Sequence, residues 1–421
     1  MEKHLLKQII LDQKEEIPEI LGKKIIKRDV HPATNEILNS DLIKVIMGVR
    51  RCGKSILAHQ SMKESYSYVN FDDERLISIK KENLNTLLEV LHEIHPGCKN
   101  LLLDEIQNVE GWELFVNRLK RMGYNITVTG SNAKLLSQEL ATHLTGRHFS
   151  IDLYPFSFKE FVTYNDVVIK KNDIYITEKR ALINNLFEEY LQLGGFPEIF
   201  TLEAKGHYLR ELFDKIITRD IVLRHNIRGV ADLKEIALYA LSNFGSRMTY
   251  HKIKNTFEIK SVHTVKNYLN YLQETYLLFQ IAPFSFKLKE QIKHPRKMYA
   301  IDTGLINALV PRGVFEYGRL MENLVFLELK RRHQEIYFYA QPDYEVDFLI
   351  KEGAKIKQLI QVCYSINKED TKKREVKALL KASDKLKCKK LLVITRDEEG
   401  EEKFGSKTVN IIPAWKWLLI K

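Results

Sequence analysis

The sequence has few cysteines and no long apolar run. Its four cysteines are Cys52, Cys98, Cys363 and Cys388, and none of them forms a C-x-x-C pair. Neither a disulfide framework nor a cysteine-based zinc site is therefore indicated. No stretch approaches 18 consecutive apolar residues, and acids interrupt the first 20 residues, where a signal peptide needs an apolar core. We therefore predict a cytoplasmic protein that does not span a membrane.

Low-complexity tracts and internal repeats are also missing from this sequence. A chain of 421 residues is too long for a single hydrophobic core, so we expect about two to four domains. The net charge is +11, and residues 205–300 hold 17 Lys and Arg against 8 Asp and Glu. Most of the positive excess lies in this segment, which indicates either a polyanionic partner or a solvated basic face.

The most informative motif is GVRRCGKS at residues 48–55, which fits G-x-x-x-x-G-K-[ST] between an apolar run and a helical pattern. Such a loop wraps phosphates with backbone N–H groups, while Lys54 reaches the β and γ oxygens and Ser55 ligates Mg²⁺. A glycine turn without function is the alternative. The residues expected at the nucleotide are Gly48, Val49, Arg50, Arg51, Cys52, Gly53, Lys54, Ser55 and Ile56. We also expect the Cys52 thiol to face the phosphates and to be reactive.

A second motif, NLLLDE at residues 100–105, is an apolar strand that ends in two acids. Alone it indicates only a solvated strand end, but downstream of a phosphate-binding loop it is typical of a Walker B strand. Asp104 is then the carboxylate that holds Mg²⁺, and Glu105 is the general base that polarises the attacking water. ATP and Mg²⁺ are the ligands that these two motifs predict together.

The pattern between residues 41 and 153 alternates strand and helix, which predicts an α/β fold with a parallel sheet. The predicted strands are 42–47, 66–71, 100–104, 125–129 and 147–153, and the predicted helices are 53–62, 82–95, 111–122 and 132–140. The fourth strand ends in Gly130, Ser131 and Asn132, where a sensor of the γ-phosphate would lie.

Beyond residue 154 helical patterns dominate. Residues 180–228 are predicted to form a helical lid, and residues 232–287 to form three short helices. The third helix is expected to open at the N-cap Ser261 and to run through Tyr276, with Lys266, Asn267 and Asn270 on its outer face. A β-wing follows at 278–286 and returns through 297–301. This order is typical of a winged helix-turn-helix. Contact with double-stranded DNA and packing or oligomerisation are both open for such a module.

Taken together, these residues resemble the prokaryotic AAA-type ATPases that carry a C-terminal domain of unknown function behind the P-loop domain. The resemblance covers nearly the whole chain. It depends on GVRRCGKS (48–55), LLLDEIQ (101–107), TGSN (129–132), LTGR (144–147), YPFSFKEF (154–161), GGFPE (194–198) and ITRDI (217–221). It implies that Asn132 or Ser131 is a sensor, that Gly195 and Pro197 belong to the adenine pocket, and that Arg147 is an arginine finger or another contact made in trans. A strand-edge charge at Arg147 and a helix C-cap at the glycine pair are the ordinary alternatives.

The last 120 residues are similar in layout to PD-(D/E)xK nucleases. Glu322 lies on an apolar helix and Asp347 matches the first acid of the motif, but the following triplet is Gln361, Val362 and Cys363. A neutral amide is a poor Mg²⁺ ligand, and a thiol cannot supply the charge of lysine. The resemblance therefore implies a nuclease-like fold without cleavage activity.

We predict five parts in all: an N-terminal helix (1–30), an AAA-type P-loop core (31–165), a helical lid (166–230), a winged helix (231–300) and a degenerate nuclease-like α/β domain (301–421). The expected function is a Mg²⁺-dependent ATPase whose nucleotide state controls engagement of a partner such as DNA, with a homo-oligomer as a further possibility. A nucleotide-gated DNA-binding or regulatory module with incidental turnover is the alternative, and an ATP-dependent nuclease is a third.

Overall fold

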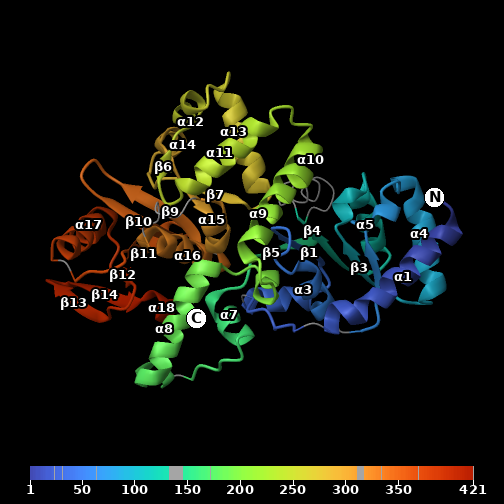
Figure 1. Ribbon diagram of the computed structural model, residues 1–421, viewed down its shortest axis with the longest axis horizontal. Helices are drawn as coiled ribbons and strands as arrows, with labels where there is room; N and C mark the ends of the chain where they lie inside the picture. Colours follow the sequence, from blue (N-terminus) through green and yellow to red (C-terminus); the bar gives the residue numbers. More distant parts are fainter. Residues whose placement is uncertain are drawn as a thin grey trace. The chain divides into compact units, whose positions relative to one another are not determined.

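The computed structural model of the chain describes every residue except 23, 31, 63, 132–145, 171, 311–316, 333, 368 and 421. The chain divides into two compact units (Figure 1). The first contains Met1–Tyr154 and Glu274–Tyr276, and the second contains Pro155–Gln273 and Leu277–Lys421. The five parts predicted from the sequence are a finer division than these two units and stay a prediction.

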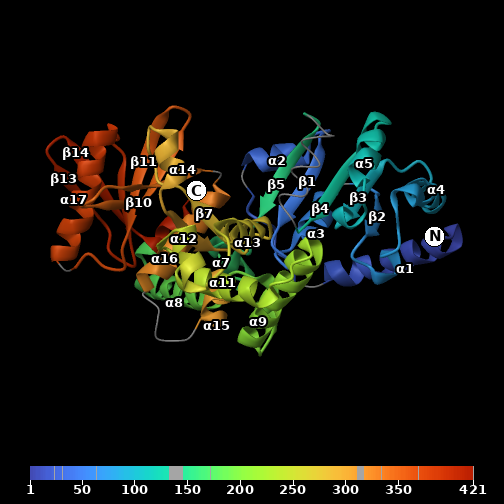
Figure 2. The ribbon, with the colours of Figure 1, turned by 90° about the horizontal axis from the view of Figure 1, so that it is seen from above.

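A five-stranded parallel sheet forms the centre of the first unit, with the order β2-β3-β4-β1-β5. The strands are β1 (Ile43–Gly48), β2 (Ser67–Asn70), β3 (Asn100–Asp104), β4 (Asn125–Gly130) and β5 (His148–Leu153). Figure 2 shows β1, β3, β4 and β5 side by side. The carboxyl ends of these strands meet at one edge of the sheet, where ligands bind in open α/β folds. The predicted parallel α/β core is confirmed.

Five described helices belong to the first unit, and four of them, all but the second, bury apolar side chains. They are α1 (Lys3–Gly22), α2 (Pro32–Leu38), α3 (Lys54–Ser61), α4 (Leu84–Ile94) and α5 (Trp112–Arg121). Helix α1 contacts α4 and β2. Its buried Gln13 exchanges two hydrogen bonds with the backbone of Asn70, at 2.9 and 3.0 Å, and so satisfies polar groups of the edge strand. The predicted helix at 132–140 lies outside the described residues.

The second unit begins with helices. They are α7 (Phe158–Tyr164), α8 (Thr177–Leu193), α9 (Lys205–Lys215), a π-helix (Ile216–Val222) and α10 (Leu223–His225). A capping box formed by Ser157 and Glu160 starts α7. Helix α8 ends at Gly194, whose φ of 76° favours glycine. The helical character predicted for residues 180–228 matches these elements.

Three helices and a small antiparallel sheet come next in the second unit. The helices are α11 (Val230–Ser242), α12 (Tyr250–Thr256) and α13 (Val262–Glu274), and the sheet has the order β6 (Arg247–Met248), β8 (Arg296–Ala300), β7 (Leu278–Ile281). As predicted, Ser261 caps α13: its hydroxyl accepts the N–H of His263 at 3.1 Å. The sequence did not predict α14 (Leu288–Lys293), which has no buried residue and hence no periodic apolar face.

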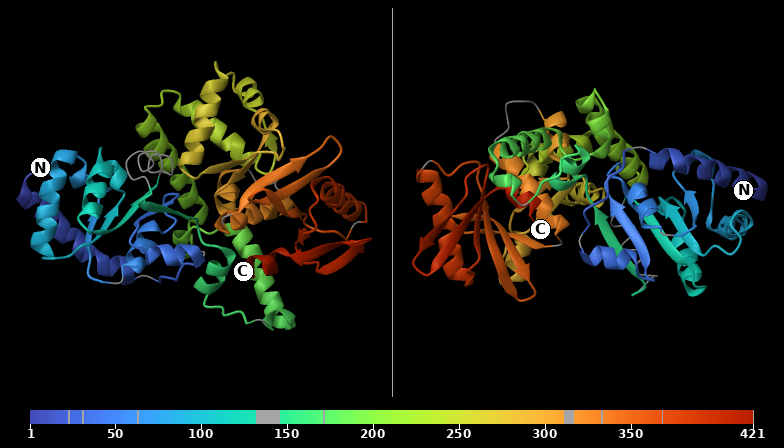
Figure 3. Two further views of the ribbon diagram at one scale, coloured as in Figure 1. Left: turned by 180° about the vertical axis from the view of Figure 1, so that it is seen from behind. Right: turned by 90° about the horizontal axis from the view of Figure 1, so that it is seen from below.

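A six-stranded mixed sheet completes the second unit, with the order β13-β14-β12-β11-β10-β9. Its strands are β9 (Glu335–Ala340), β10 (Glu345–Glu352), β11 (Lys355–Val362), β12 (Leu391–Thr395), β13 (Gly400–Phe404) and β14 (Lys407–Pro413). The helices that pack on it are α16 (Tyr317–Arg331), α17 (Glu369–Leu386) and α18 (Ala414–Leu419), whereas α15 (Thr303–Leu309) packs against α8 and α9. Helix α17 packs along this sheet (Figure 3) and buries Leu379 and Ala382 in its core. Every helix in the described part of the chain is too short or too polar to cross a bilayer.

Candidate functional site

The loop that follows β1 has the backbone geometry of a phosphate-binding loop. Gly53 begins α3 with a φ of 95°, a left-handed conformation that favours glycine. A Cβ on Gly48 would meet the carbonyl oxygen of Leu153 at 2.1 Å, so only glycine fits at that position. Because the loop ends at a helix N-terminus, its N–H groups and the helix dipole favour an anion. The backbone thus agrees with the motif found in the sequence.

The Cys52 side chain points to the rear of this loop, so the prediction of a reactive thiol that faces the phosphates is wrong. Its sulfur lies 3.4 Å from the carbonyl oxygen of Leu153, and the residue is fully buried. Burial raises the pKa of the thiol, although Lys54 and Arg28 oppose the shift. The sequence also gave no sign of Arg28, whose guanidinium donates to the carbonyls of Cys52 at 2.8 Å and Tyr154 at 2.6 Å.

Lys54 and Glu105 face each other across the carboxyl edge of the sheet. Lys54 is buried, and its ammonium lies 3.4 Å from Glu105 Oε1 and 3.3 Å from the carbonyl oxygen of Val49. Glu105 follows β3 directly, in a left-handed conformation with φ 51°. This turn takes the residue out of the strand and places its carboxylate beside the loop. The structure therefore brings the two principal residues of the predicted site together.

The Asp104 carboxylate and the Ser55 hydroxyl are oxygen ligands of the type that Mg²⁺ binds. Its buried carboxylate accepts hydrogen bonds from the hydroxyls of Ser55 and Thr129. Burial and the neighbouring Glu105 raise the pKa of Asp104, and the two hydroxyls oppose this. No cluster of three or more His, Cys, Asp or Glu side chains that could hold a metal occurs among the described residues. Mg²⁺ commonly takes one or two protein oxygens and completes its shell with phosphate and water, so Ser55 and Asp104 fit that role.

Glu105 is held as an oriented carboxylate. Burial would raise its pKa, but the Lys54 ammonium, the amide of Gln107, Arg50 and the N–H of Ser131 together lower it. The Ser131 N–H donates to Glu105 Oε2 at 3.2 Å, which fixes one carboxylate oxygen from the end of β4. The Ser131 hydroxyl is buried and has no hydrogen-bond partner among the described residues. Asn132, the other predicted sensor, lies outside the described residues.

Arg147 lies at the opposite edge of the sheet from the loop. Its carbonyl accepts the N–H of Ile43 at 3.0 Å, at the start of β1, whereas the loop follows Gly48 at the end of that strand. The intervening strand spans roughly 17 Å. The exposed guanidinium of Arg147 lies 3.4 Å from Asn117 Oδ1. Arg147 is therefore too far from the loop to contact phosphates bound by the same chain, and a strand-edge charge and a contact in trans both stay open.

Gly195 and Pro197 belong to the second unit, where each has a structural role. The N–H of Gly195 donates to Asp302 at 2.7 Å, its carbonyl accepts from Phe156 N at 2.7 Å, and a Cβ at this position would meet Phe156 O at 2.2 Å. Pro197 opens a short 3₁₀ helix. These contacts explain the residues without a ligand, and their place in an adenine pocket stays a prediction.

Tyr276 is a residue of the first unit that the sequence did not single out. It lies two residues beyond α13, and its hydroxyl donates to Asp152 Oδ1 at 2.6 Å. Its ring meets Tyr154 edge to face, with centroids 6.5 Å apart. Burial and the carboxylate of Asp152 raise the pKa of Tyr276, so the hydroxyl stays protonated and donates. The end of α13 is thus anchored at β5, beside the residues that Arg28 and Cys52 contact.

The predicted acids of the C-terminal sheet also come together. The N–H of Asp347 donates to Gln361 Oε1 at 3.2 Å, and Asp347 Oδ2 accepts from Val362 N at 3.0 Å. Burial raises the pKa of the Cys363 thiol to about 12. The sequence reasoning missed Lys297 of β8, which lies 2.9 Å from Glu322 and 3.0 Å from Asp347. A lysine is therefore present here, although the Gln361 triplet lacks one.

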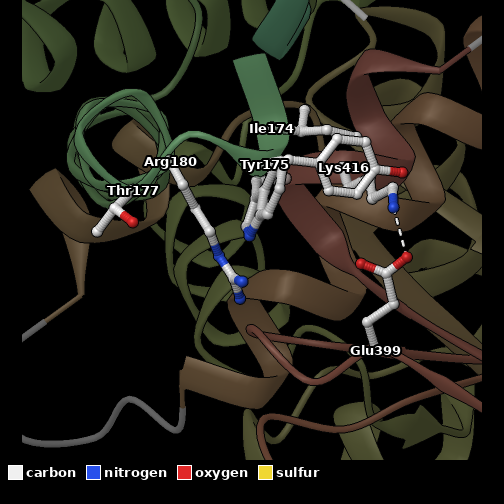
Figure 4. A pocket seen from close by; sticks show the side chains of 7 residues that line it. Ile174, Tyr175, Thr177, Arg180, Glu399 and Lys416 are labelled. Atoms are coloured by element: carbon white, nitrogen blue, oxygen red, sulfur yellow. Dashed lines mark hydrogen bonds and ion pairs between the residues drawn. The ribbon is translucent and has the colours of Figure 1, made fainter. Parts of the chain in front are cut away.

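A surface pocket in the second unit offers weaker chemistry. Figure 4 shows Arg180 and Lys416 at its wall, with Tyr175 between them. Both cations already have acidic partners. The Arg180 guanidinium lies 2.8 Å from Asp397 Oδ1, and the Lys416 ammonium forms an ion pair with Glu399. An anionic ligand would have to compete with these carboxylates, so we do not assign a site here.

Comparisons with known proteins place the chain in a family. The family model "AAA domain" matches residues 40–162, and two models described as domains of unknown function, DUF8612 and DUF4143, match residues 184–316 and 317–417. An uncharacterized protein of Methanocaldococcus jannaschii is 39% identical over 99% of this chain and 96% of its own length. An uncharacterized protein of Haemophilus influenzae is 32% identical over 90% of this chain and 95% of its own.

Among solved structures, the replication initiator DnaA bound to AMPPCP and single-stranded DNA matches 60% of this chain and 91% of its own. The sequence identity is 18% and the TM-score is 0.27. A TM-score this low does not define a common fold. The family assignment therefore depends on the two relatives and the family models.

Proposed function

Because the chain belongs to the family of proteins that join an AAA domain to the domain of unknown function DUF4143, we propose that it is a Mg²⁺-dependent ATPase. We further propose that its nucleotide state controls how the C-terminal half engages double-stranded DNA. The observation that carries the ATPase assignment is the convergence of Lys54, Asp104 and Glu105 at one edge of the sheet.

In this proposal each residue at the edge has one task. Glu105 is ionised at neutral pH, because its pKa is lowered, and it accepts the proton of the water that attacks the γ-phosphorus. The new bond joins the water oxygen to phosphorus, the bond to the ADP oxygen breaks, and inorganic phosphate leaves. Lys54 and the loop N–H groups bind the phosphates, and Ser55 and Asp104 would hold Mg²⁺. The metal supplies neutralisation of charge on the phosphate oxygens.

A chain of contacts within the first unit supports control of the C-terminal half. Arg28 joins the loop, at Cys52, to Tyr154, and Tyr154 meets the ring of Tyr276. Tyr276 in turn follows α13, the proposed recognition helix, after a single residue. A change in the loop on nucleotide binding thus has a packed route to the end of α13. Such a route is a spatial argument, and functional coupling has to be measured.

We expect Tyr276→Phe to separate the two activities. The substitution keeps the buried ring but removes the hydroxyl that donates to Asp152 at 2.6 Å. Basal ATP turnover should stay within about twofold of wild type, while the stimulation by duplex DNA should fall by at least about fivefold, the lower range of measured allosteric couplings. The measurement is the ATPase rate with and without a DNA duplex.

Tyr175→Phe is the matched control, because its hydroxyl lies in the second unit and the residue is 75% exposed. Equal DNA stimulation in wild type and Tyr276→Phe would show that the hydroxyl only packs the core. If the wild-type rate does not respond to duplex DNA at all, the proposed partner is wrong and the ATPase assignment is unaffected.

The basic charge around α12 and α13 favours DNA as the partner. Lys252 and Lys266 are exposed and Lys254 is half-buried, on the two helices that a winged helix turns toward nucleic acid. The arrangement of three helices and a three-stranded sheet supports the winged-helix interpretation. The other interpretation is a module for packing or oligomerisation, in which the same lysines only keep the surface soluble.

The joint replacement of Lys252, Lys254 and Lys266 by alanine should weaken duplex binding and flatten its salt dependence. Each lost phosphate contact reduces the slope of log K against log salt by about 0.9, so three contacts give a change of about 2.7. Binding is measured by fluorescence anisotropy at several salt concentrations. The control replaces Lys355, Lys389 and Lys390, which are exposed and change the net charge equally. If both triple variants keep the wild-type slope, α12 and α13 do not bind the phosphates.

Arg147 and the helical lid complete the proposal. Because Arg147 cannot reach the phosphates of its own chain, we propose that it contacts those of a neighbouring copy in a homo-oligomer, and that residues 166–230 with Gly195 and Pro197 cover the nucleotide. The alternative function is a nucleotide-gated regulatory module with incidental turnover. Turnover stimulated by DNA favours the ATPase over this alternative.

A further inference from the structure

A buried cluster of charge lies where the small sheet and the C-terminal sheet meet within the second unit. Lys297 of β8 is 3% exposed, and Glu322 of α16 and Asp347 of β10 are each 8% exposed. The Lys297 ammonium lies 2.9 Å from Glu322 Oε1, 3.0 Å from Asp347 Oδ1 and 2.7 Å from Glu345 Oε1. One ammonium therefore serves three carboxylates from two elements.

Other donors and acceptors fix the same carboxylates. The hydroxyl of Tyr299 donates to Glu322 Oε1 at 2.6 Å, and the N–H of Val362 donates to Asp347 Oδ2 at 3.0 Å. The guanidinium of Arg247, on β6, forms an ion pair with Oε2 of Glu345. The acids are therefore held in place by the fold and have no freedom to turn away from one another.

Three fixed carboxylates with a neighbouring amide oxygen are the ligand type that divalent cations prefer. A nuclease-like fold would place Mg²⁺ among such acids, but the residues present do not fit a metal. The ammonium occupies the space between Glu322 and Asp347, and it is joined to β8 by a buried side chain. Among the described residues, no group of three or more His, Cys, Asp or Glu side chains is arranged to hold a metal ion.

We propose that the Lys297 ammonium stands in place of a divalent cation, so that this acid cluster fastens β8 to the C-terminal sheet and binds no metal. The small sheet and the C-terminal sheet are then joined by an internal cation that cannot dissociate. Removal of the ammonium should convert the cluster into a divalent-cation site made by Glu322, Glu345 and Asp347. The triplet at Gln361 lacks the lysine of the nuclease motif, and Lys297 of β8 places a lysine among the same acids from another strand.

The test compares thermal unfolding of the full chain with and without 10 mM Mn²⁺, without nucleotide. Mn²⁺ should shift the melting temperature of wild type and of Asp347→Asn by the same amount, because the cluster binds no metal in either. Lys297→Met should gain a saturable Mn²⁺ response, with a melting temperature raised by about 4 °C, and Lys297→Met with Asp347→Asn should lose it. Any Mn²⁺ bound at the P-loop is common to all variants and cancels. Lys351→Met is the matched control, since Lys351 lies on β10, the strand of Asp347, and pairs with an exposed carboxylate, Glu335.

Two results would overturn the proposal. One is a wild-type Mn²⁺ response that Asp347→Asn abolishes, because the cluster would then hold a metal beside the lysine. The other is a folded Lys297→Met that shows no Mn²⁺ response. Should Lys297→Met be unfolded without metal, circular dichroism follows its refolding on addition of Mn²⁺. For an unfolded Lys297→Met, failure of Mn²⁺ to restore a fold that Lys297→Arg keeps is the equivalent of this second result.

Discussion

Glu105→Gln is expected to bind ATP as tightly as wild type and to hydrolyse it about a hundredfold to ten-thousandfold more slowly. This range is the usual contribution of a positioned general base. Glutamine keeps the shape of the side chain and can still accept the N–H of Ser131 on its amide oxygen. It cannot take a proton from water. The effect should therefore fall on turnover and leave binding unchanged.

Binding is measured with a fluorescent ATP analogue and turnover by phosphate release. Glu110→Gln is the matched control, because Glu110 is an exposed acid five residues further along the chain. Glu105→Gln also removes the charged partner of Lys54, so the Lys54 ammonium is freer to bind phosphate. Slightly tighter binding is compatible with the proposal. Hydrolysis at the wild-type rate would show that Glu105 is not the base.

The nucleotide site could be predicted from the sequence because its parts are contiguous. The loop at 48–55 and the acids at 104 and 105 each occupy one strand end, and the parallel order of the sheet brings strand ends together. The direction of single side chains could not be read in the same way. Cys52 sits in the motif, but the close approach of Leu153 to Gly48 turns its sulfur to the rear of the loop.

The residues that the sequence did not reveal make contacts over long sequence separations. Lys297 reaches Glu322 and Asp347, which lie 25 and 50 positions away on other elements. The strand pattern of residues 296–300 gives no sign of a buried lysine, because an inward position in a strand normally holds an apolar side chain. The sequence pattern predicts a helix that continues through Tyr276, whereas α13 ends at Glu274 and Tyr276, with a φ of 63°, belongs to the first unit.

Lys54→Ala should weaken ATP binding by about 10- to 150-fold and abolish measurable turnover. The range corresponds to the loss of a charge-assisted hydrogen bond of about 1.5 to 3 kcal/mol. Lys54 is buried at the N-terminus of α3, where the loop ends. Equilibrium binding of the fluorescent ATP analogue measures the change.

Lys54→Ala also changes the pKa of Glu105, an effect that replacement of a loop residue far from Glu105 would not have. The ammonium lowers the pKa of Glu105, so its removal should raise that pKa. The stability that the ionised Glu105 carboxylate contributes is present above its unfolded-state pKa and is lost as the pH falls. In Lys54→Ala this loss would begin at a higher pH than in wild type. We expect Lys54→Ala to melt at a lower temperature than wild type at pH 8, with a smaller difference at pH 5, because the ion pair stops contributing in wild type once Glu105 becomes protonated. Lys99→Ala, at an exposed lysine of the first unit, should match wild type in both assays. Wild-type ATP affinity in a folded Lys54→Ala would remove the basis for placing the phosphates at this loop.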